Sequence, residues 1–169
     1  MDDRAYMTRA LALAKSAKGQ TTPNPSVGCV IVKDGAILSE GVTGGGARAW
    51  GPHGEVVALA PLGERARGAT LYVTLEPCSF HGKTAPCVEA IEAAGIEKVV
   101  VGMIDPNPKV AGKGLDYLRH AGIDVELGLM GDACKAHLVP WSHFILTGRP
   151  WVVLKGGMSL DGKVATRTG

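Results

Sequence analysis

The sequence predicts one α/β domain built on a mixed β-sheet, and two observations support this. From about residue 69 onward, short apolar segments alternate with segments of helical spacing. That order is typical of parallel strands joined by helices on both faces of a sheet. The apolar segments 27–32 and 36–42 are instead separated by Asp34-Gly35, a typical hairpin turn, so we expect this pair to be antiparallel. The length of 169 residues suits one domain with a sizeable core.

The remaining elements follow in order. Before residue 69, apolar residues at helical spacing and the turn residues predict a helix at 3–17, a loop at 21–28, the hairpin, a flexible loop from Gly44 to Pro52 and a helix at 54–60. After it, they predict a strand at 69–75, a helix at 86–94, a strand at 97–103, a loop at 105–114, a helix at 114–121, a strand at 123–128 and a helix at 130–147 with a break at Pro140.

A domain boundary is expected near residue 148. Gly148-Arg149-Pro150 interrupts the pattern, and WVVLKGGMSLDGK at 151–163 reads as a fresh strand and turn. Residues 1–147 would then be one domain, and 148–169 a linker with the first strand of another. Trp141 and Trp151, which flank the boundary, are expected to be packing residues.

Composition excludes several classes of protein. The net charge of +2 is too small to indicate nucleic-acid binding. No apolar run approaches the roughly 20 residues of a membrane span, and the N-terminus does not resemble a secretory signal. Four cysteines without such a signal indicate the reducing cytoplasm, where clustered cysteines more often bind metal or act in catalysis than form disulfides.

Three candidate metal ligands stand out. Cys78 follows the strand at 69–75, and Cys87 and His53 each follow a proline at the start of a predicted helix. Helix N-termini favour the thiolate form that binds metal. One His and two Cys are the donors of a catalytic zinc site, in which the fourth position stays open for a water that zinc activates. Glu55 is then well placed as the proton carrier.

Two alternatives stay open at this point. A structural zinc site would need a fourth ligand, for which His81, Cys29 and Cys134 are the candidates. A zinc module that only binds partner proteins would show no open coordination position. The offset of Glu55 from His53 argues against the structural site, because such a site has no use for a proton carrier.

His53-Gly54-Glu55 followed by Pro77-Cys78 resembles the signature of the zinc-dependent nucleobase deaminases. It departs from that signature in the spacing of the two cysteines: eight residues lie between Cys78 and Cys87, whereas two lie between the cysteines of a C-x-x-C motif. Within that group, the segments TPNPSVGCVIV at 22–32, CSFHGKTAPC at 78–87, DPNPKVAGKG at 105–114 and WVVLKGGMSLDGK at 151–163 resemble those of the riboflavin-biosynthesis pyrimidine deaminases. The resemblance covers nearly the whole chain. It implies a cytidine deaminase-like fold, a three-layer α/β/α sandwich with a mixed sheet of about five strands.

The resemblance also implies an activity. It is the zinc-dependent hydrolytic removal of an amino group, as ammonia, from 2,5-diamino-6-(5-phosphoribosylamino)pyrimidin-4(3H)-one, with Glu55 moving the protons. A homo-oligomer is expected, and in a full-length form a fused C-terminal NADPH-dependent reductase domain. By the same match the substrate would be held by Asn24 at the pyrimidine edge, by Lys83 at the ribose phosphate, and by Asp105 and Asn107 in a second loop.

Three departures from the family pattern bear on substrate contacts. Phe80 stands where the family has His, Gly54 where it has Ala, and Gly44–Gly46 occupy a region in which a His is common. The closest competing function is deamination of free cytidine or deoxycytidylate, which needs the same chemistry. A nucleic-acid deaminase would instead have the shorter C-x-x-C spacing and a basic surface.

Overall fold

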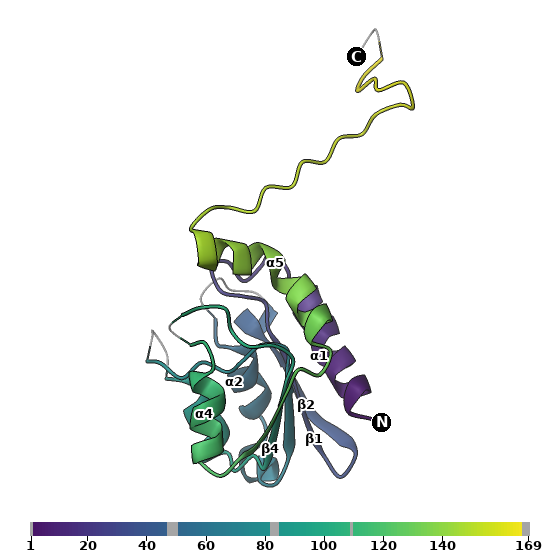
Figure 1. Ribbon diagram of the computed structural model, residues 1–169. Helices are drawn as coiled ribbons and strands as arrows, with labels where there is room; N and C mark the ends of the chain where they lie inside the picture. The colour runs from purple at the N-terminus through teal and green to yellow at the C-terminus, as the bar shows by residue number, and fades with distance from the viewer. Residues whose placement is uncertain (1, 47–50, 82–84, 109, 167–169) are drawn as a thin grey trace.

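A computed structural model describes residues 2–46, 51–81, 85–108 and 110–166 (Figure 1). The strands are β1 (Gly28–Lys33), β2 (Ala36–Val42), β3 (Thr70–Val73), β4 (Lys98–Val101) and β5 (Asp124–Leu127). The α-helices are α1 (Asp3–Ser16), α2 (Gly54–Leu59), α3 (Cys87–Ala93), α4 (Lys113–His120) and α5 (Gly131–Thr147). Each element lies where the sequence pattern predicts it, although several strands are two to three residues shorter.

The five strands form one mixed sheet in the order β2-β1-β3-β4-β5. Strand β1 pairs antiparallel with both β2 and β3, while β3–β4 and β4–β5 are parallel. The expected hairpin and the expected parallel half of the sheet are therefore both confirmed. Because β1 runs against β3, the chain segment that enters β1 lies at the same end of the sheet as the segments that leave β2, β3 and β4.

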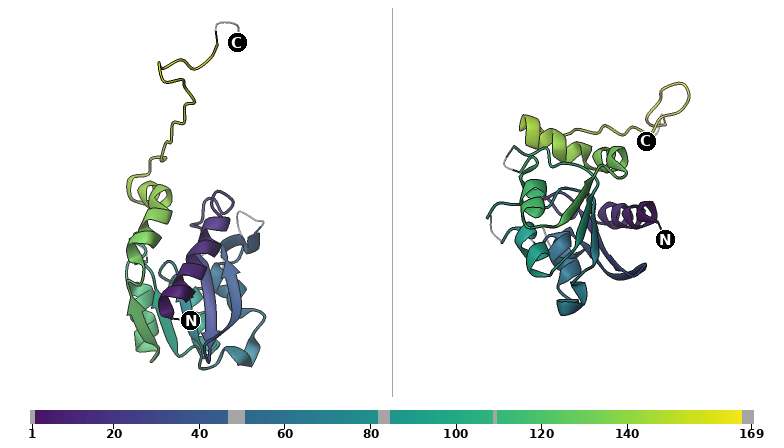
Figure 2. Two further views of the ribbon diagram at one scale, coloured as in Figure 1. Left: turned by 90° about the vertical axis from the view of Figure 1, so that its right-hand side faces the viewer. Right: turned by 60° about the horizontal axis from the view of Figure 1, so that its bottom comes forward.

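Helices cover both faces of this sheet, which makes the three layers that the family resemblance implies (Figure 2). Helices α1 and α5 lie on one face, and α2, α3 and α4 lie on the other. The core between the layers is almost wholly aliphatic: Met7, Ile31, Leu71, Ile91 and Leu118 are among its largest fully buried side chains. Burial of these apolar side chains is the main stabilising contribution to such a domain.

Two expected features differ in the structure. Pro140 bends α5 without ending it, so one helix runs from Gly131 to Thr147 (Figure 1). The missing N–H of a proline costs a helix one hydrogen bond, and packing of the flanking turns can compensate. The strand expected from Trp151 onward is not formed: described residues up to 166 extend away from the domain without strand pairing. A strand needs a neighbouring strand, and this segment has none among the described residues.

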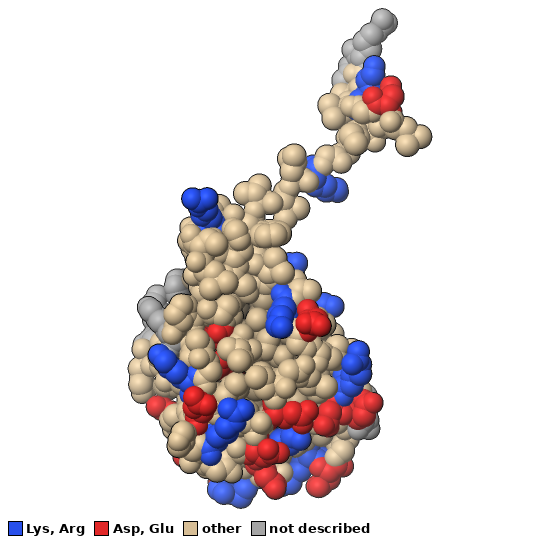
Figure 3. Space-filling view, in the orientation of Figure 1, with Lys and Arg blue, Asp and Glu red and all other residues tan. Residues whose placement is uncertain are grey.

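The side of the molecule shown in Figure 3 carries no large basic patch, because Lys and Arg are interspersed there with Asp and Glu. Among the described residues, no helix is both long and apolar enough to cross a membrane.

Candidate functional site

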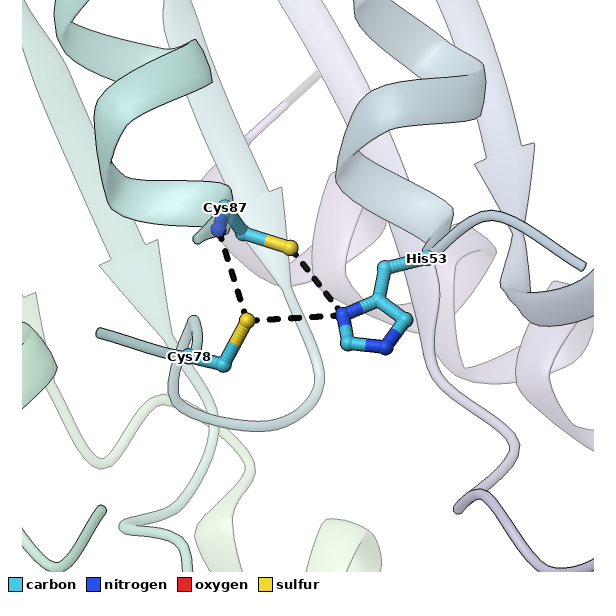
Figure 4. Close-up of side chains that lie close together, drawn as sticks. All are labelled: His53, Cys78 and Cys87. Atoms are coloured by element: carbon cyan, nitrogen blue, oxygen red, sulfur yellow. Dashed lines mark hydrogen bonds between the residues drawn. The ribbon is translucent and has the colours of Figure 1, made fainter. Parts of the chain in front are cut away.

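Three side chains from separate parts of the sequence meet at one end of the sheet (Figure 4). Nδ1 of His53 lies 3.1 Å from Sγ of Cys87 and 3.5 Å from Sγ of Cys78. The three ligand atoms all lie within 4.8 Å of one another. The three metal ligands predicted from the sequence are therefore brought together, with one nitrogen facing two sulfurs.

The fold explains this meeting. His53 is the N-cap of α2, Cys87 is the first residue of α3, and Cys78 follows the carboxyl end of β3. The backbone N–H of Cys87 donates to Sγ of Cys78 at 3.3 Å. Hydrogen bonds from Cys87, and then from His53, hold the pKa of the Cys78 thiol well below its ordinary value. The pKa of Cys87 is raised, chiefly by its hydrogen bond with Cys78, because two adjacent thiols resist carrying two negative charges.

The donor set fits zinc. In a tetrahedral zinc site with Zn–S near 2.3 Å and Zn–N near 2.0–2.1 Å, neighbouring N and S ligands are about 3.6 Å apart. The separations of 3.1 and 3.5 Å found here are close to that spacing. Binding would also resolve the conflict between the two thiols, since a divalent cation stabilises both thiolates.

A fourth protein ligand is not found among the described residues. His81 is exposed and pairs with Glu89 at 3.1 Å. Cys29 and Cys134 are fully buried in the hydrophobic core, and neither joins the metal-ligand cluster. This leaves three protein ligands, the number found in catalytic zinc sites, and argues against the structural alternative.

Glu55 lies beside the cluster, in the first turn of α2, and is 3% exposed. It lines the same cavity as His53 and Cys78. Burial raises the pKa of its carboxyl to about 7, with the charge of His53 acting in the opposite direction. A carboxyl with a pKa near neutrality can both accept and donate a proton at physiological pH, which is what a general acid–base requires.

Close packing fixes the start of α2 against the hairpin. A Cβ on Gly41 of β2 would lie 2.1 Å from the carbonyl oxygen of Gly54. A Cβ on Gly54 would lie 2.8 Å from the carbonyl oxygen of Val27. Gly54 departs from the family pattern. Its lack of a side chain lets the start of α2 lie close to the backbone of Val27, and this close packing also sets the position of His53 and Glu55.

The cavity next to the cluster has a volume of about 300 Å³, the size of a small-molecule site. Three of the four predicted substrate residues, Asn24, Asp105 and Asn107, line it together with the metal-site residues. Burial raises the pKa of Asp105 to about 6, and its Oδ1 accepts the backbone N–H of Asn107 at 2.7 Å. Lys83 lies outside the described residues. The roles of all four residues stay predictions.

Sequence reasoning missed Glu76, which precedes Pro77-Cys78 and is 3% exposed. Its Oε2 accepts the backbone N–H groups of Asp105 and Gly112 at 3.1 and 2.9 Å. Its Oε1 accepts those of Gly114 and Leu115 at 2.8 and 3.4 Å. One carboxylate therefore binds the loop that carries Asp105 to the segment that carries Cys78. An acidic residue two positions before a predicted metal ligand was the available signal.

Comparison with known proteins identifies the family. Residues 1–103 match the model of the "Cytidine and deoxycytidylate deaminase zinc-binding region". The chain belongs to this deaminase family. The match covers β1 to β4 and all three residues of the cluster.

Relatives within the deaminase family place the chain more closely. It is 53% identical over 169 residues to the riboflavin biosynthesis protein RibD of Escherichia coli, covering 100% of this chain and 45% of the relative. A crystal structure of the Thermotoga maritima diaminohydroxyphosphoribosylaminopyrimidine deaminase/5-amino-6-(5-phosphoribosylamino)uracil reductase superposes with a TM-score of 0.89 at 43% identity, over 98% of this chain and 47% of that one. The chain thus spans slightly under half the length of these relatives.

A deaminase that was solved as a C-terminal deletion mutant is also similar. The Rib2 deaminase of Aspergillus oryzae, solved in complex with DARIPP, superposes with a TM-score of 0.60 at 26% identity, covering 82% of this chain and 99% of that one. The expected resemblance to riboflavin-pathway deaminases and the expected fold are confirmed by these matches. Zinc is supported at the level of the family and of the donor set.

Proposed function

We propose that this deaminase acts on 2,5-diamino-6-(5-phosphoribosylamino)pyrimidin-4(3H)-one and releases ammonia to give 5-amino-6-(5-phosphoribosylamino)uracil, a step of riboflavin biosynthesis. The observation that carries the proposal is the position of Glu55, buried beside the His53–Cys78–Cys87 cluster in the cavity that Asn24, Asp105 and Asn107 line. The relatives named for this reaction are similar over the whole chain.

The residues divide the chemistry among them. His53, Cys78 and Cys87 would hold zinc. When bound, zinc supplies a Lewis acid that brings the pKa of water near 7. The Glu55 carboxylate accepts a proton from the attacking water as the C–O bond forms at the ring carbon that bears the amine. The resulting carboxyl donates that proton to the ring nitrogen. The carboxylate then takes the proton of the hydroxyl now on the ring carbon and passes it to the amine, so the C=O bond forms, the C–N bond breaks and ammonia departs.

Substrate binding would fall to the two loops that line the cavity together with Glu55. Asn24 can both donate to and accept from the polar edge of the pyrimidine. The Asp105–Asn107 loop is held in place by Glu76 and contributes further polar groups. Lys83 remains our proposed contact for the ribose phosphate, because its ammonium group is a compact cation that suits a phosphate.

The C-terminal boundary is likewise a proposal. We propose that residues 148–169 are a linker and the first strand of a reductase domain, which the Thermotoga relative carries by name. Described residues from 150 to 166 are exposed throughout. A chain that ends at Gly148 should therefore unfold at the same temperature as the full chain within about 2 °C. A homo-oligomer and a cytoplasmic location also stay proposals.

A genetic complementation experiment tests the pathway assignment. The chain is expressed in a bacterium that lacks deaminase activity, keeps its reductase and cannot grow without riboflavin. We expect growth with the wild-type chain and none with Glu55→Gln at equal expression. Absence of growth with a wild-type chain that is folded and zinc-loaded would overturn the assignment to this pathway.

A further inference from the structure

One face of α5 lies against the candidate active site. Trp141 and Ile145 line the cavity together with His53, Glu55 and Cys78. Residues four apart lie on the same face of a helix, so Trp141 and Ile145 form one continuous strip. The cavity thus has a wall contributed by a helix that follows every predicted catalytic and substrate residue in the sequence. The preceding residue of the same strip, His137, is buried.

His137 fixes this wall to the loop that carries Asn24. Its Nε2 lies 2.9 Å from Oγ and 3.2 Å from the carbonyl oxygen of Ser26. The loop is closed by a hydrogen bond from the backbone N–H of Asn24 to the carbonyl oxygen of Thr21 at 2.8 Å. The Thr21 hydroxyl donates back to the carbonyl oxygen of Asn24 at 2.9 Å. Trp141 therefore lies one helical turn from His137, whose contact with Ser26 anchors α5 to the loop that carries Asn24.

The chemistry of the wall favours the flat part of the substrate. Trp141 packs partly against the hydrophobic core, and its remaining surface faces the cavity. Among the described residues that line the cavity there is no Lys or Arg. An indole and an aliphatic side chain suit the face of a heterocyclic ring, whereas a phosphoribosyl group needs cations and hydrogen-bond donors.

We propose that Trp141 is a substrate-contacting specificity residue, whose indole covers the face of the bound pyrimidine ring, with Ile145 beside it. This inference rests on the proposed function. It gives α5 a role in substrate recognition in addition to packing near the domain boundary. Phe80, which is 40% exposed, also lines the cavity but comes from the loop after Cys78.

Steady-state ammonia release from the diaminopyrimidinone by the zinc-loaded full chain tests the proposal. We expect Trp141→Ala to raise KM by about tenfold, as loss of one base–aromatic contact does, with kcat within threefold of wild type. Trp141→Phe should recover most of the loss. Ile145→Ala should raise KM less. Leu146→Ala, at a neighbouring side chain that is 63% exposed, is the matched control and should leave both constants unchanged.

A second measurement reports contact directly. Titration with the product, 5-amino-6-(5-phosphoribosylamino)uracil, should quench the tryptophan fluorescence of wild type and of Trp151→Phe, but not of Trp141→Phe. Unchanged KM in Trp141→Ala together with quenching that persists in Trp141→Phe would overturn the inference while wild-type turnover still supported the function. If Trp141→Ala failed to fold, Ile145→Ala and the fluorescence of Trp141→Phe would decide. A wild-type protein that released no ammonia would instead overturn the proposed function itself.

Discussion

Nδ1 of His53 lies 3.1 Å from Sγ of Cys87, although 34 residues separate them in the sequence. Each of the two residues stands at the start of a helix, α2 or α3, on the same face of the sheet. The fold therefore brings the donor set together. Because the unfolded chain does not hold these ligands close to one another, metal binding adds to the stability of the folded state.

The first prediction concerns metal removal. Cys87→Ser should reduce zinc from one atom per chain to well below one, because a hydroxyl is a much weaker zinc ligand than a thiolate. In the wild type, free zinc at a hundredfold excess over its Kd should raise the free energy of unfolding by about 2.7 kcal/mol relative to chelated protein. Elemental analysis and thermal unfolding measure the two effects. Cys134→Ala is the matched control, and equal zinc in Cys87→Ser would contradict the ligand assignment.

The second prediction separates Glu55 from the metal site. Glu55→Gln preserves shape but cannot move protons, so turnover should fall by about 10²–10⁴-fold while zinc content and unfolding temperature stay near those of wild type. Glu64→Gln is the control, because that side chain is 90% exposed and away from the cavity. Substantial activity in Glu55→Gln would remove this carboxylate from the proton transfers.

The third prediction concerns Glu76. The Glu76 carboxylate accepts hydrogen bonds from four backbone N–H groups. A glutamine at this position would turn its own N–H₂ group toward two of them, so those two hydrogen bonds would be lost. We expect Glu76→Gln to lower the free energy of unfolding by about 3 kcal/mol. It should also raise KM more than it lowers kcat, because the displaced loop carries Asp105 and Asn107. Denaturant unfolding and steady-state kinetics measure this, with the exposed Glu97→Gln as control. Unchanged stability would show that the four contacts contribute little.

The fourth prediction is a pH dependence at Asp105. Burial raises the pKa of this carboxyl from 3.8 to about 6 in the folded chain. A raised folded-state pKa means that the stabilising contribution is complete below pH 4 and is lost as the pH rises through 6. In Asp105→Asn that dependence disappears. The unfolding free energy of wild type should therefore fall, relative to Asp105→Asn, by up to about 3 kcal/mol between pH 4 and 7.

Chelated protein should be used for this comparison, so that pH-dependent zinc binding does not contribute. Denaturant unfolding of both proteins at several pH values gives the difference. A constant difference across this range would show that Asp105 titrates near its ordinary pKa and that the surrounding loop leaves it in contact with water.

Much of this fold could be predicted from local patterns. The Asp34-Gly35 turn, the alternation after residue 69 and the prolines before His53 and Cys87 are signals contained in short stretches of sequence, and each corresponds to an element in the structure. The meeting of His53, Cys78 and Cys87 was predictable because their positions at helix starts and a strand end imply a common edge of the sheet.

Contacts that depend on tertiary packing could not be predicted. Nothing in the sequence near Glu76 shows that its partners begin 29 residues later at Asp105. The position of Trp141 on the cavity wall depends on how α5 crosses the sheet, and hence on the contact between His137 and Ser26. The strand predicted at Trp151 stays a prediction for a related reason, since the apolar pattern is present but a pairing partner is not among the described residues.

The most direct test of the central claim is ammonia release by the zinc-loaded chain. Three substrates are compared in parallel: the phosphoribosylated diaminopyrimidinone, cytidine and deoxycytidylate, each with a chelated control. We predict release from the diaminopyrimidinone alone, abolished by the chelator and restored by zinc. Release from cytidine or deoxycytidylate but not from the diaminopyrimidinone would keep the zinc chemistry and contradict the substrate.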